Sequence, residues 1–287
     1  MSGEDAPRAA TSPADATPER PEATTTAAGR PAALRVATFN IRNGIAFDGL
    51  DSWPLRRRAT AQAVADLNAD LIGLQEVYGF QQRYLLRHAP GFAATGAGRS
   101  DGRERGERCA VFYRGARLAL SSSTTRWFSD TPQLPGSTGW GNRLPRVVTL
   151  ARFTDLATGR VFGLADCHLE GAPAAARHRS AAVLPTWLDP ELPWIVAGDL
   201  NAEPDDEALR TLLAAGLRDV FAPAAAAPVA APPTTRPRGG QRARRIDYLL
   251  VTREWQVGTA AVAAAGHHRR ASDHLPVVAT VRLLPDR

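Results

Sequence analysis

The sequence predicts an α+β fold in which two β-sheets pack together and helices cover their outer faces. Two observations support this prediction. Four strand-like runs between residues 110 and 168 follow one another without an obvious helix between them. The helical segments are few and dispersed among many strands, which does not fit a strictly alternating parallel α/β fold. The length of 287 residues, 44% of them hydrophobic, suits one large domain with or without tails.

In the first part of the chain, strands are predicted where apolar and polar residues alternate or where a short apolar run ends on polar residues. Apolar residues at helical spacing predict helices. The predicted strands are 34–40, 70–76, 110–114, 117–128, 146–153 and 161–168, and the predicted helices are 55–68 and 78–88. A long loop rich in Pro and Gly, 129–145, separates two of these strands.

The second part of the chain continues the same mixture. Residues 174–188 are predicted to be helical until Pro185 intervenes, 193–199 to form a buried strand, and 205–215 to form a helix. The last three predicted strands are 246–252, 256–264 and 276–284. Residues 222–245 begin Ala/Pro-rich and then become basic, which predicts a long, mobile surface loop.

The N-terminal segment has almost no large apolar residue before Leu34, so residues 1–33 are predicted to be a disordered tail and 34–287 the folded domain. We expect a cytoplasmic protein without a membrane span, because no secretory signal is apparent and no apolar run is long enough to cross a membrane. We also expect a monomer. Two cysteines, Cys109 and Cys167, do not make a disulfide framework.

The excess of basic over acidic residues in the chain has two interpretations. The formal net charge is +6, and all 35 basic residues are Arg. A basic surface could bind a polyanion such as nucleic acid. Abundant Ala and the lack of Lys also fit a compositional bias of the whole genome, so the charge alone does not decide.

Polar or acidic residues stand at or near the ends of many strand-like runs. They are Asn40, Glu76, His168, Asp199, Asn201, Asp247, Asp273 and His274. Buried carboxylates are costly unless they are paired or bound to a cation, so several at one sheet edge predict a divalent metal. Oxygen ligands such as those of Glu76 and Asn40 suit Mg²⁺ or Mn²⁺ better than zinc.

Six short segments occur in the order known from one family. They are 37–42, 74–76, 167–169, 197–201, 245–248 and 272–276. With them the chain resembles the endonuclease/exonuclease/phosphatase superfamily, which includes deoxyribonuclease I, over residues 34–284. The resemblance implies a four-layer α/β/β/α sandwich of two mixed β-sheets with flanking helices. Further segments between residues 98 and 146 resemble a bacterial branch whose members are mostly known only as metal-dependent hydrolases.

The resemblance implies a Mg²⁺- or Mn²⁺-dependent phosphoesterase with assigned catalytic residues. Asp199 would activate the attacking water as a general base, and Asn201 would orient the water or the phosphate. His168 and His274 would contact the scissile phosphate, with Asp247 fixing the tautomer of His274. A turn-forming Asp or Asn and structural histidines are the plainer alternatives.

The metal ligands implied by the resemblance are Glu76, Asn40 and Asp273. Glu76 could instead pair with an arginine, and Asn40 could cap a turn.

Three residues are predicted to contact substrate. Arg42 and Arg146 could clamp phosphate oxygens through their guanidinium groups or form ordinary ion pairs. Trp140 could stack on a base or sugar or anchor its loop. The five arginines between residues 236 and 245 could bind a polyanion or keep a loop soluble. His267 and His268 are predicted to lie solvated in a polar turn.

Three functions remain open from the sequence. The first is hydrolysis of a phosphodiester by a nuclease or nucleotide phosphodiesterase, favoured by the arginine-rich loop and Trp140. The second is a phosphomonoesterase acting on a small or lipid-linked phosphate. The third is a catalytically silent binding module, which the intact set of polar strand-end residues argues against. The fold alone does not choose among substrates.

Overall fold

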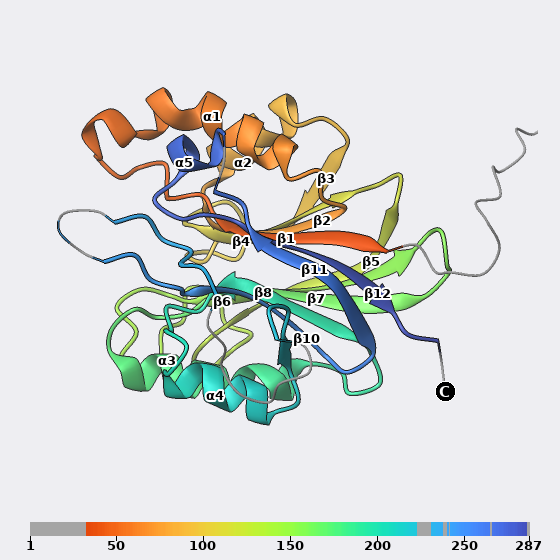
Figure 1. The fold of residues 1–287 in the computed structure, drawn as a ribbon. Helices are drawn as coiled ribbons and strands as arrows, with labels where there is room; N and C mark the ends of the chain where they lie inside the picture. The colour runs from red at the N-terminus through yellow and green to blue at the C-terminus, as the bar shows by residue number, and fades with distance from the viewer. Residues whose placement is uncertain (1–32, 223–230, 238–239, 241, 265, 286–287) are drawn as a thin grey trace, which may run out of the picture. The chain divides into compact units, whose positions relative to one another are not determined.

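Two six-stranded mixed β-sheets pack face to face with helices on their outer faces in this computed structural model (Figure 1). It describes residues 33–222, 231–237, 240, 242–264 and 266–285. The α+β sandwich predicted from the sequence is therefore confirmed. The predicted disordered tail, 1–33, lies outside the described residues except for Ala33.

The first sheet places the ends of β1 and β2 side by side. Its strand order is β11 (Trp255–Val262), β12 (Val277–Leu283), β1 (Leu34–Asn40), β2 (Leu71–Val77), β4 (Arg108–Arg114) and β3 (Phe92–Thr95). Strands β1 and β2 are parallel, with Asn40 opposite Gln75, and the other pairs are antiparallel. Parallel strands end at the same sheet edge, so Asn40 and Glu76 come together there.

The second sheet brings three more predicted site residues into register. Its strand order is β5 (Leu118–Trp127), β6 (Val147–Asp155), β7 (Val161–His168), β8 (Trp194–Asp199), β10 (Asp247–Val251) and β9 (Arg218–Asp219). His168 on β7 and Asp247 on β10 both lie opposite Asp199 on β8. The three side chains therefore leave the sheet at one edge.

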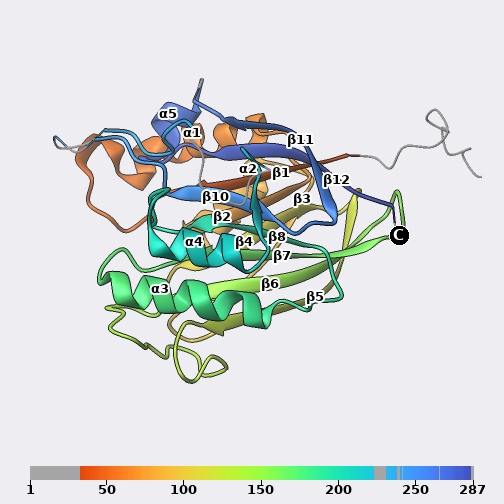
Figure 2. The same cartoon turned by 60° about the horizontal axis from the view of Figure 1, so that its bottom comes forward.

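The helices divide between the two outer faces (Figure 1, Figure 2). Helices α1 (Trp53–Asp66), α2 (Gly79–His88) and α5 (His268–Ala271) lie on the first sheet, and α3 (Ala174–Val183) and α4 (Glu207–Ala214) on the second. Two 3₁₀ turns, η1 (Gly49–Asp51) and η2 (Leu184–Trp187), precede α1 and follow α3. No helix in the described ranges is long and apolar enough to cross a membrane.

The core between the sheets is apolar and closely interlocked. Phe153, Phe162 and Trp255 are almost fully buried there, and Phe162 meets Trp255 edge to face with ring centroids 5.2 Å apart. Burying side chains of this size removes a large apolar area from water. This rigid core holds the two sheet edges, and the site residues on them, in one arrangement.

Three short elements and one histidine differ from the sequence prediction. Strands β3 and β9 and helix α5 were not predicted, since each has only two to four residues and no clear periodicity. The prediction that His268 is solvated was wrong. Its ring is buried against α1, with Nε2 3.2 Å from the carbonyl oxygen of Ala63, whereas His267 is exposed.

Part of the predicted mobile surface loop, 222–245, is packed against the domain, whereas Pro232, Pro233 and Arg242 are exposed. Residues 223–230, 238–239 and 241 lie outside the described residues. Thr234 is fully buried, and Thr235 forms an isolated antiparallel bridge with His274. Arg245 is buried in an ion pair with Asp219, a charge partner that local sequence does not reveal.

Candidate active site

One asparagine side chain connects the edges of the two sheets. Asn40, fully buried at the end of β1, donates hydrogen bonds through Nδ2 to Oε1 of Glu76 (3.0 Å) and Oδ2 of Asp199 (2.9 Å). Its Oδ1 accepts a hydrogen bond from the Arg42 main chain (2.9 Å). The strand-end residues of both sheets therefore meet in one site, as the sequence predicts.

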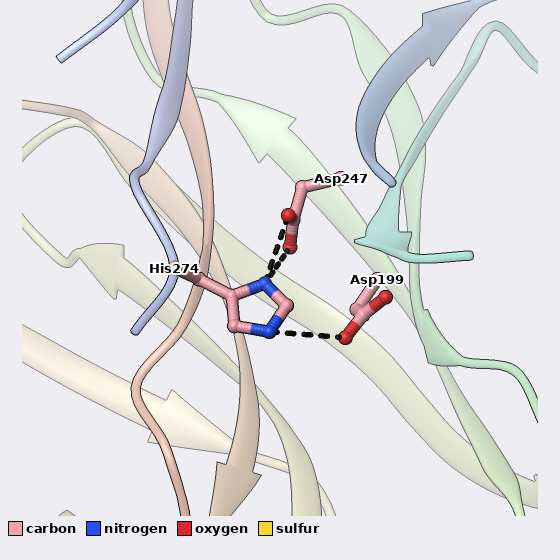
Figure 3. Close-up of side chains that lie close together, drawn as sticks. All are labelled: Asp199, Asp247 and His274. Atoms are coloured by element: carbon pink, nitrogen blue, oxygen red, sulfur yellow. Dashed lines mark hydrogen bonds and ion pairs between the residues drawn. The ribbon is translucent and has the colours of Figure 1, made fainter. Parts of the chain in front are cut away.

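His274 lies between two aspartates of the second sheet (Figure 3). Its Nδ1 is 2.9 and 3.1 Å from the two carboxylate oxygens of Asp247, and its Nε2 is 3.8 Å from Oδ2 of Asp199. The Asp247 carboxylate, itself fully buried, accepts a hydrogen bond from the Nδ1–H of His274. The imidazole is therefore oriented with Nε2 toward Asp199.

His168 approaches the same oxygen of Asp199 from another strand. Its Nε2 is 3.5 Å from Asp199 Oδ2 and 3.2 Å from Nδ2 of Asn201. The main-chain N–H of Asn201 donates to the other carboxylate oxygen of Asp199 (2.9 Å). Asp199 is 2% exposed. Its carboxylate contacts Asn40, Asn201 and the imidazoles of both histidines.

Burial and neighbouring charge shift the titration of these groups in opposite directions. Burial and the Asp247 carboxylate raise the pKa of Asp199 to about 7. Burial lowers the pKa of His274, but Asp247 and Asp199 outweigh it and raise that pKa to about 10. Burial, and then Arg146, hold the pKa of His168 well below its ordinary value. The imidazole of His274 is thus charged and that of His168 is neutral at neutral pH.

Backbone strain gathers at this site. Arg42, Glu76 and Asn201 are three of the five described non-glycine residues with positive φ, at 60°, 62° and 50°. Such conformations are costly for residues with a Cβ and tend to occur at functional sites. Asn43, which follows Arg42, donates its main-chain N–H to Oε2 of Glu76 (2.7 Å), so the strained segments also hold the Glu76 carboxylate.

The predicted metal ligands form a connected network rather than a closed cage. Asp273 Oδ2 lies 3.3 Å from Nη1 of Arg42, whose main chain contacts Asn40. Among the described residues, the His, Cys, Asp and Glu ligand atoms that lie within 4.8 Å of one another belong to Asp199, Asp247 and His274. These three residues differ from the predicted metal ligands, Glu76, Asn40 and Asp273.

The donor set nevertheless fits a hard divalent cation. Glu76, Asp199, Asp247 and Asp273 bring four carboxylates to the place where the edges of the two sheets meet. Burial and the Asp247 carboxylate raise the pKa of Asp199. A divalent cation would relieve this excess of negative charge, and oxygen ligands suit Mg²⁺ or Mn²⁺.

The predicted substrate contacts are engaged with protein groups. Arg42 forms two bonds with Asp48, at 2.9 and 3.0 Å. Trp140 donates its indole N–H to Asp130 (2.9 Å), and the Arg179 guanidinium lies 5.0 Å from its ring centroid. These contacts of Trp140 are the ones expected of a side chain that anchors its loop.

Arg146, the third predicted substrate contact, lies at the rim of the site. Its Nη2 and Nε are 3.2 and 3.4 Å from the Glu170 carboxylate. Glu170 was missed by the sequence analysis, although it stands two residues after His168 at the same strand end and could have been found from that position.

Two further residues at the site were also missed. Ser272 donates its hydroxyl to the Asn40 carbonyl (2.7 Å), and Thr234 donates its hydroxyl to Asp247 Oδ2 (2.6 Å). Ser272 could have been found as the neighbour of Asp273. Thr234 stands in a Pro- and Ala-rich stretch that gives no local signal.

The two-sheet sandwich and the polar site at its edge agree with a family of hydrolases that act on phosphate esters. The sequence profile of the Endonuclease/Exonuclease/phosphatase family matches residues 37–274. The chain belongs to this family, as the order of its six sequence segments predicts.

Solved structures similar to this chain include two bacterial proteins and one human domain. An endonuclease/exonuclease/phosphatase family protein from Bacteroides thetaiotaomicron is 27% identical with a TM-score of 0.78, covering 88% of this chain and 95% of that one. A mannosyl-6-phosphatase from the same organism is 27% identical with a TM-score of 0.76, covering 87% and 100%. The human Nocturnin catalytic domain with bound sulfate is 23% identical with a TM-score of 0.68, covering 88% and 94%, and shows the fold alone.

Proposed function

We propose that this chain is a divalent-metal-dependent phosphoesterase that cleaves its substrate by in-line attack of water on phosphorus. The observation that supports this most is the double hydrogen bond from Asn40 to Glu76 and Asp199, which joins the carboxylates of both sheets in one site. Family membership agrees with a reaction at phosphate esters.

A Mg²⁺ or Mn²⁺ ion would be held by Glu76, with Asn40 and Asp273 beside it. When bound, such an ion neutralises phosphate charge and stabilises the leaving oxygen. The Asn40 side-chain oxygen also accepts from the Arg42 main chain, so its metal contact would use the remaining lone pair of that oxygen.

The chain's own residues supply the proton and charge chemistry. Asp199 accepts the proton of the attacking water at its carboxylate, and Asn201 keeps that carboxylate in place through its main-chain N–H. His274, with Nδ1 held by Asp247, presents Nε2 to a phosphoryl oxygen and stabilises the charge that develops there. His168 contacts the phosphate from the β7 side.

The test is hydrolysis of para-nitrophenyl phosphate and bis-para-nitrophenyl phosphate with Mg²⁺ or Mn²⁺, with and without chelator. Asp199→Ala and His274→Ala should each lower kcat/KM by at least about 100-fold, the range expected for loss of a general acid or base. Asp205→Ala, on the exposed loop before α4, is the matched control and should match wild type. Equal rates for wild type and the two site variants on both substrates would contradict the proposal.

The sequence favours a phosphodiester substrate, through the arginine-rich loop and Trp140. Trp140 is engaged with Asp130, and within the loop Arg242 and Arg245 pair with Glu203 and Asp219. These two arguments for nucleic acid are therefore weaker than the sequence alone suggests.

A phosphomonoester is the second candidate substrate class, favoured by the likeness to a mannosyl-6-phosphatase. A panel of oligonucleotides, nucleotides and phosphomonoesters separates the two classes. A nuclease would cleave oligonucleotides with marked salt sensitivity, whereas a phosphomonoesterase would release orthophosphate. A silent binding module would bind neither Mg²⁺ nor Mn²⁺ in calorimetry and would turn over no substrate.

A further inference from the structure

A small pocket lined by three arginines adjoins the candidate active site. Arg99, Arg108 and Arg146 line it together with Glu107, and Glu76 and His168 form its boundary with the site. Its volume of about 10 Å³ is room for about one water molecule or one oxygen atom of a ligand. The pocket is therefore small, and its lining carries three guanidinium groups against two carboxylates.

The three arginines are buried, and Arg108 is the one whose counter-ion is not buried with it. Their side chains are 9%, 3% and 14% exposed, in sequence order. Arg99 has a short ion pair with Glu107 (2.6 Å), but the partner of Arg108, Glu104, is 73% exposed. Buried charges without close, buried partners are costly, so this pocket favours an added anion.

Two of the arginines retain donors that the protein does not use. Nε of Arg108 is buried and has no hydrogen-bond partner among the described residues. Arg146 meets Glu170 only at 3.2 and 3.4 Å, longer than the ~2.7–2.9 Å of a good charge-assisted bond. Within the described part of the chain, Nη1 of Arg146 donates no hydrogen bond to protein.

The guanidinium groups of this pocket also act electrostatically on His168 in the candidate active site. After burial, Arg146 is the largest cause that lowers the pKa of His168, and Arg99 adds to it. A negatively charged oxygen near His168 would be attracted by the same guanidinium groups.

We infer that this pocket is a subsite for one terminal, anionic oxygen of the substrate's phosphoryl group, with Arg108 and Arg146 as its donors and Arg99 as a neighbouring positive charge. The inference rests on the proposed phosphoesterase function and specifies its substrate class. A phosphomonoester offers a free oxygen in each non-leaving position. The metal ion and His274 would hold two of the three non-leaving oxygens, so this pocket receives the third. In a diester that third oxygen carries a carbon chain, which exceeds the volume of the pocket, so the subsite selects monoesters over diesters.

Binding of inorganic phosphate to the full chain in magnesium chloride tests the subsite without turnover. By calorimetry, Arg108→Gln and Arg146→Gln should each weaken phosphate binding by about tenfold or more, the effect of losing a charge-assisted contact. Arg103→Gln, an exposed arginine on the loop before β4, should bind as wild type does. Thermal unfolding shows whether each variant is folded, and the two pocket variants serve as alternatives if one is not. Equal phosphate binding in wild type and the folded pocket variants would overturn the subsite.

Kinetics on the two para-nitrophenyl esters separate failure of the subsite from failure of the proposed function. Wild type should prefer the monoester, and the pocket variants should lose about tenfold in kcat/KM on the monoester but at most about twofold on the diester. If wild type hydrolyses neither ester, the proposed function fails. If wild type is active and the variants lose both activities equally, or neither, the subsite is wrong while the phosphoesterase stands.

Discussion

The hydroxyl of Thr234 donates a hydrogen bond of 2.6 Å to Oδ2 of Asp247, the carboxylate that holds Nδ1 of His274. The same hydroxyl oxygen accepts from the main-chain N–H groups of Ile246 (3.0 Å) and Asp247 (3.1 Å). Thr234 and Asp247 are fully buried. One side chain from a Pro-rich segment therefore uses its whole hydrogen-bonding capacity beneath the candidate active site.

Replacing Thr234 by Val should destabilise the fold, because it leaves two buried N–H groups and one carboxylate oxygen without this partner. The free energy of unfolding should fall by at least about 2 kcal/mol, given roughly 1–3 kcal/mol for each buried group left unsatisfied. Thr234→Ser keeps the hydroxyl and should stay within about 1 kcal/mol of wild type. Urea unfolding measures both, and equal stability of the Val and Ser variants would show that the hydroxyl contributes little.

Replacing Asp247 by Asn should lower activity through the orientation of His274. The amide no longer provides the negative charge that Nδ1 of His274 contacts, so the imidazole loses its fixed tautomer and part of its charge. We expect kcat to fall by about 100-fold or more with KM little changed. Asp205→Asn serves as the exposed control in the same assay, and a kcat near wild type for Asp247→Asn would exclude this role.

Glu76 should contribute directly to metal affinity. Glu76→Gln removes a carboxylate charge but keeps an oxygen and nearly the same volume. Mg²⁺ or Mn²⁺ binding measured by calorimetry should weaken by at least about tenfold. Chelator should abolish turnover by wild type, and added Mg²⁺ or Mn²⁺ should restore it. Glu191→Gln, an exposed glutamate, is the control, and unchanged affinity in Glu76→Gln would remove Glu76 from the metal site.

Asp166 should make stability depend on pH. It is fully buried, its Oδ1 accepts from Nε2 of Gln75 (2.6 Å), and burial raises its pKa well above the ordinary value. Below the unfolded pKa of about 4 both states hold the proton. Above it the unfolded chain loses the proton first, so stability falls as pH rises, by at most about 1.4 kcal/mol per pH unit for this group, until the folded pKa is passed.

The comparison of wild type with Asp166→Asn isolates this effect. The stability of the Asn variant relative to wild type should increase between pH 4.5 and 7.5 in urea unfolding, within the slope of about 1.4 kcal/mol per pH unit. Asp130→Asn, at an exposed site, controls for general charge effects. A stability difference that stays constant with pH would show that Asp166 is ionised in the folded chain.

The sequence by itself determined most long elements and the residues at their ends. Alternation of apolar and polar residues over 34–40 predicted β1, because successive side chains of a strand point to opposite faces. The short apolar run 193–199 predicted β8, because a strand buried on both faces is apolar throughout. The short elements β3 and β9 escaped, since pairing with neighbouring strands forms them rather than local pattern.

Only the tertiary structure decided which charged and polar groups become partners. Asn40 meets Asp199 across 159 positions of sequence, and Arg245 meets Asp219 across 26. The sequence shows that such groups exist. Packing of the sheets decides which group lies close enough to a buried charge to stabilise it. For this reason local sequence predicted a strand-end site with Asp199, whereas the basic pocket and the buried Thr234 became visible only in the folded chain.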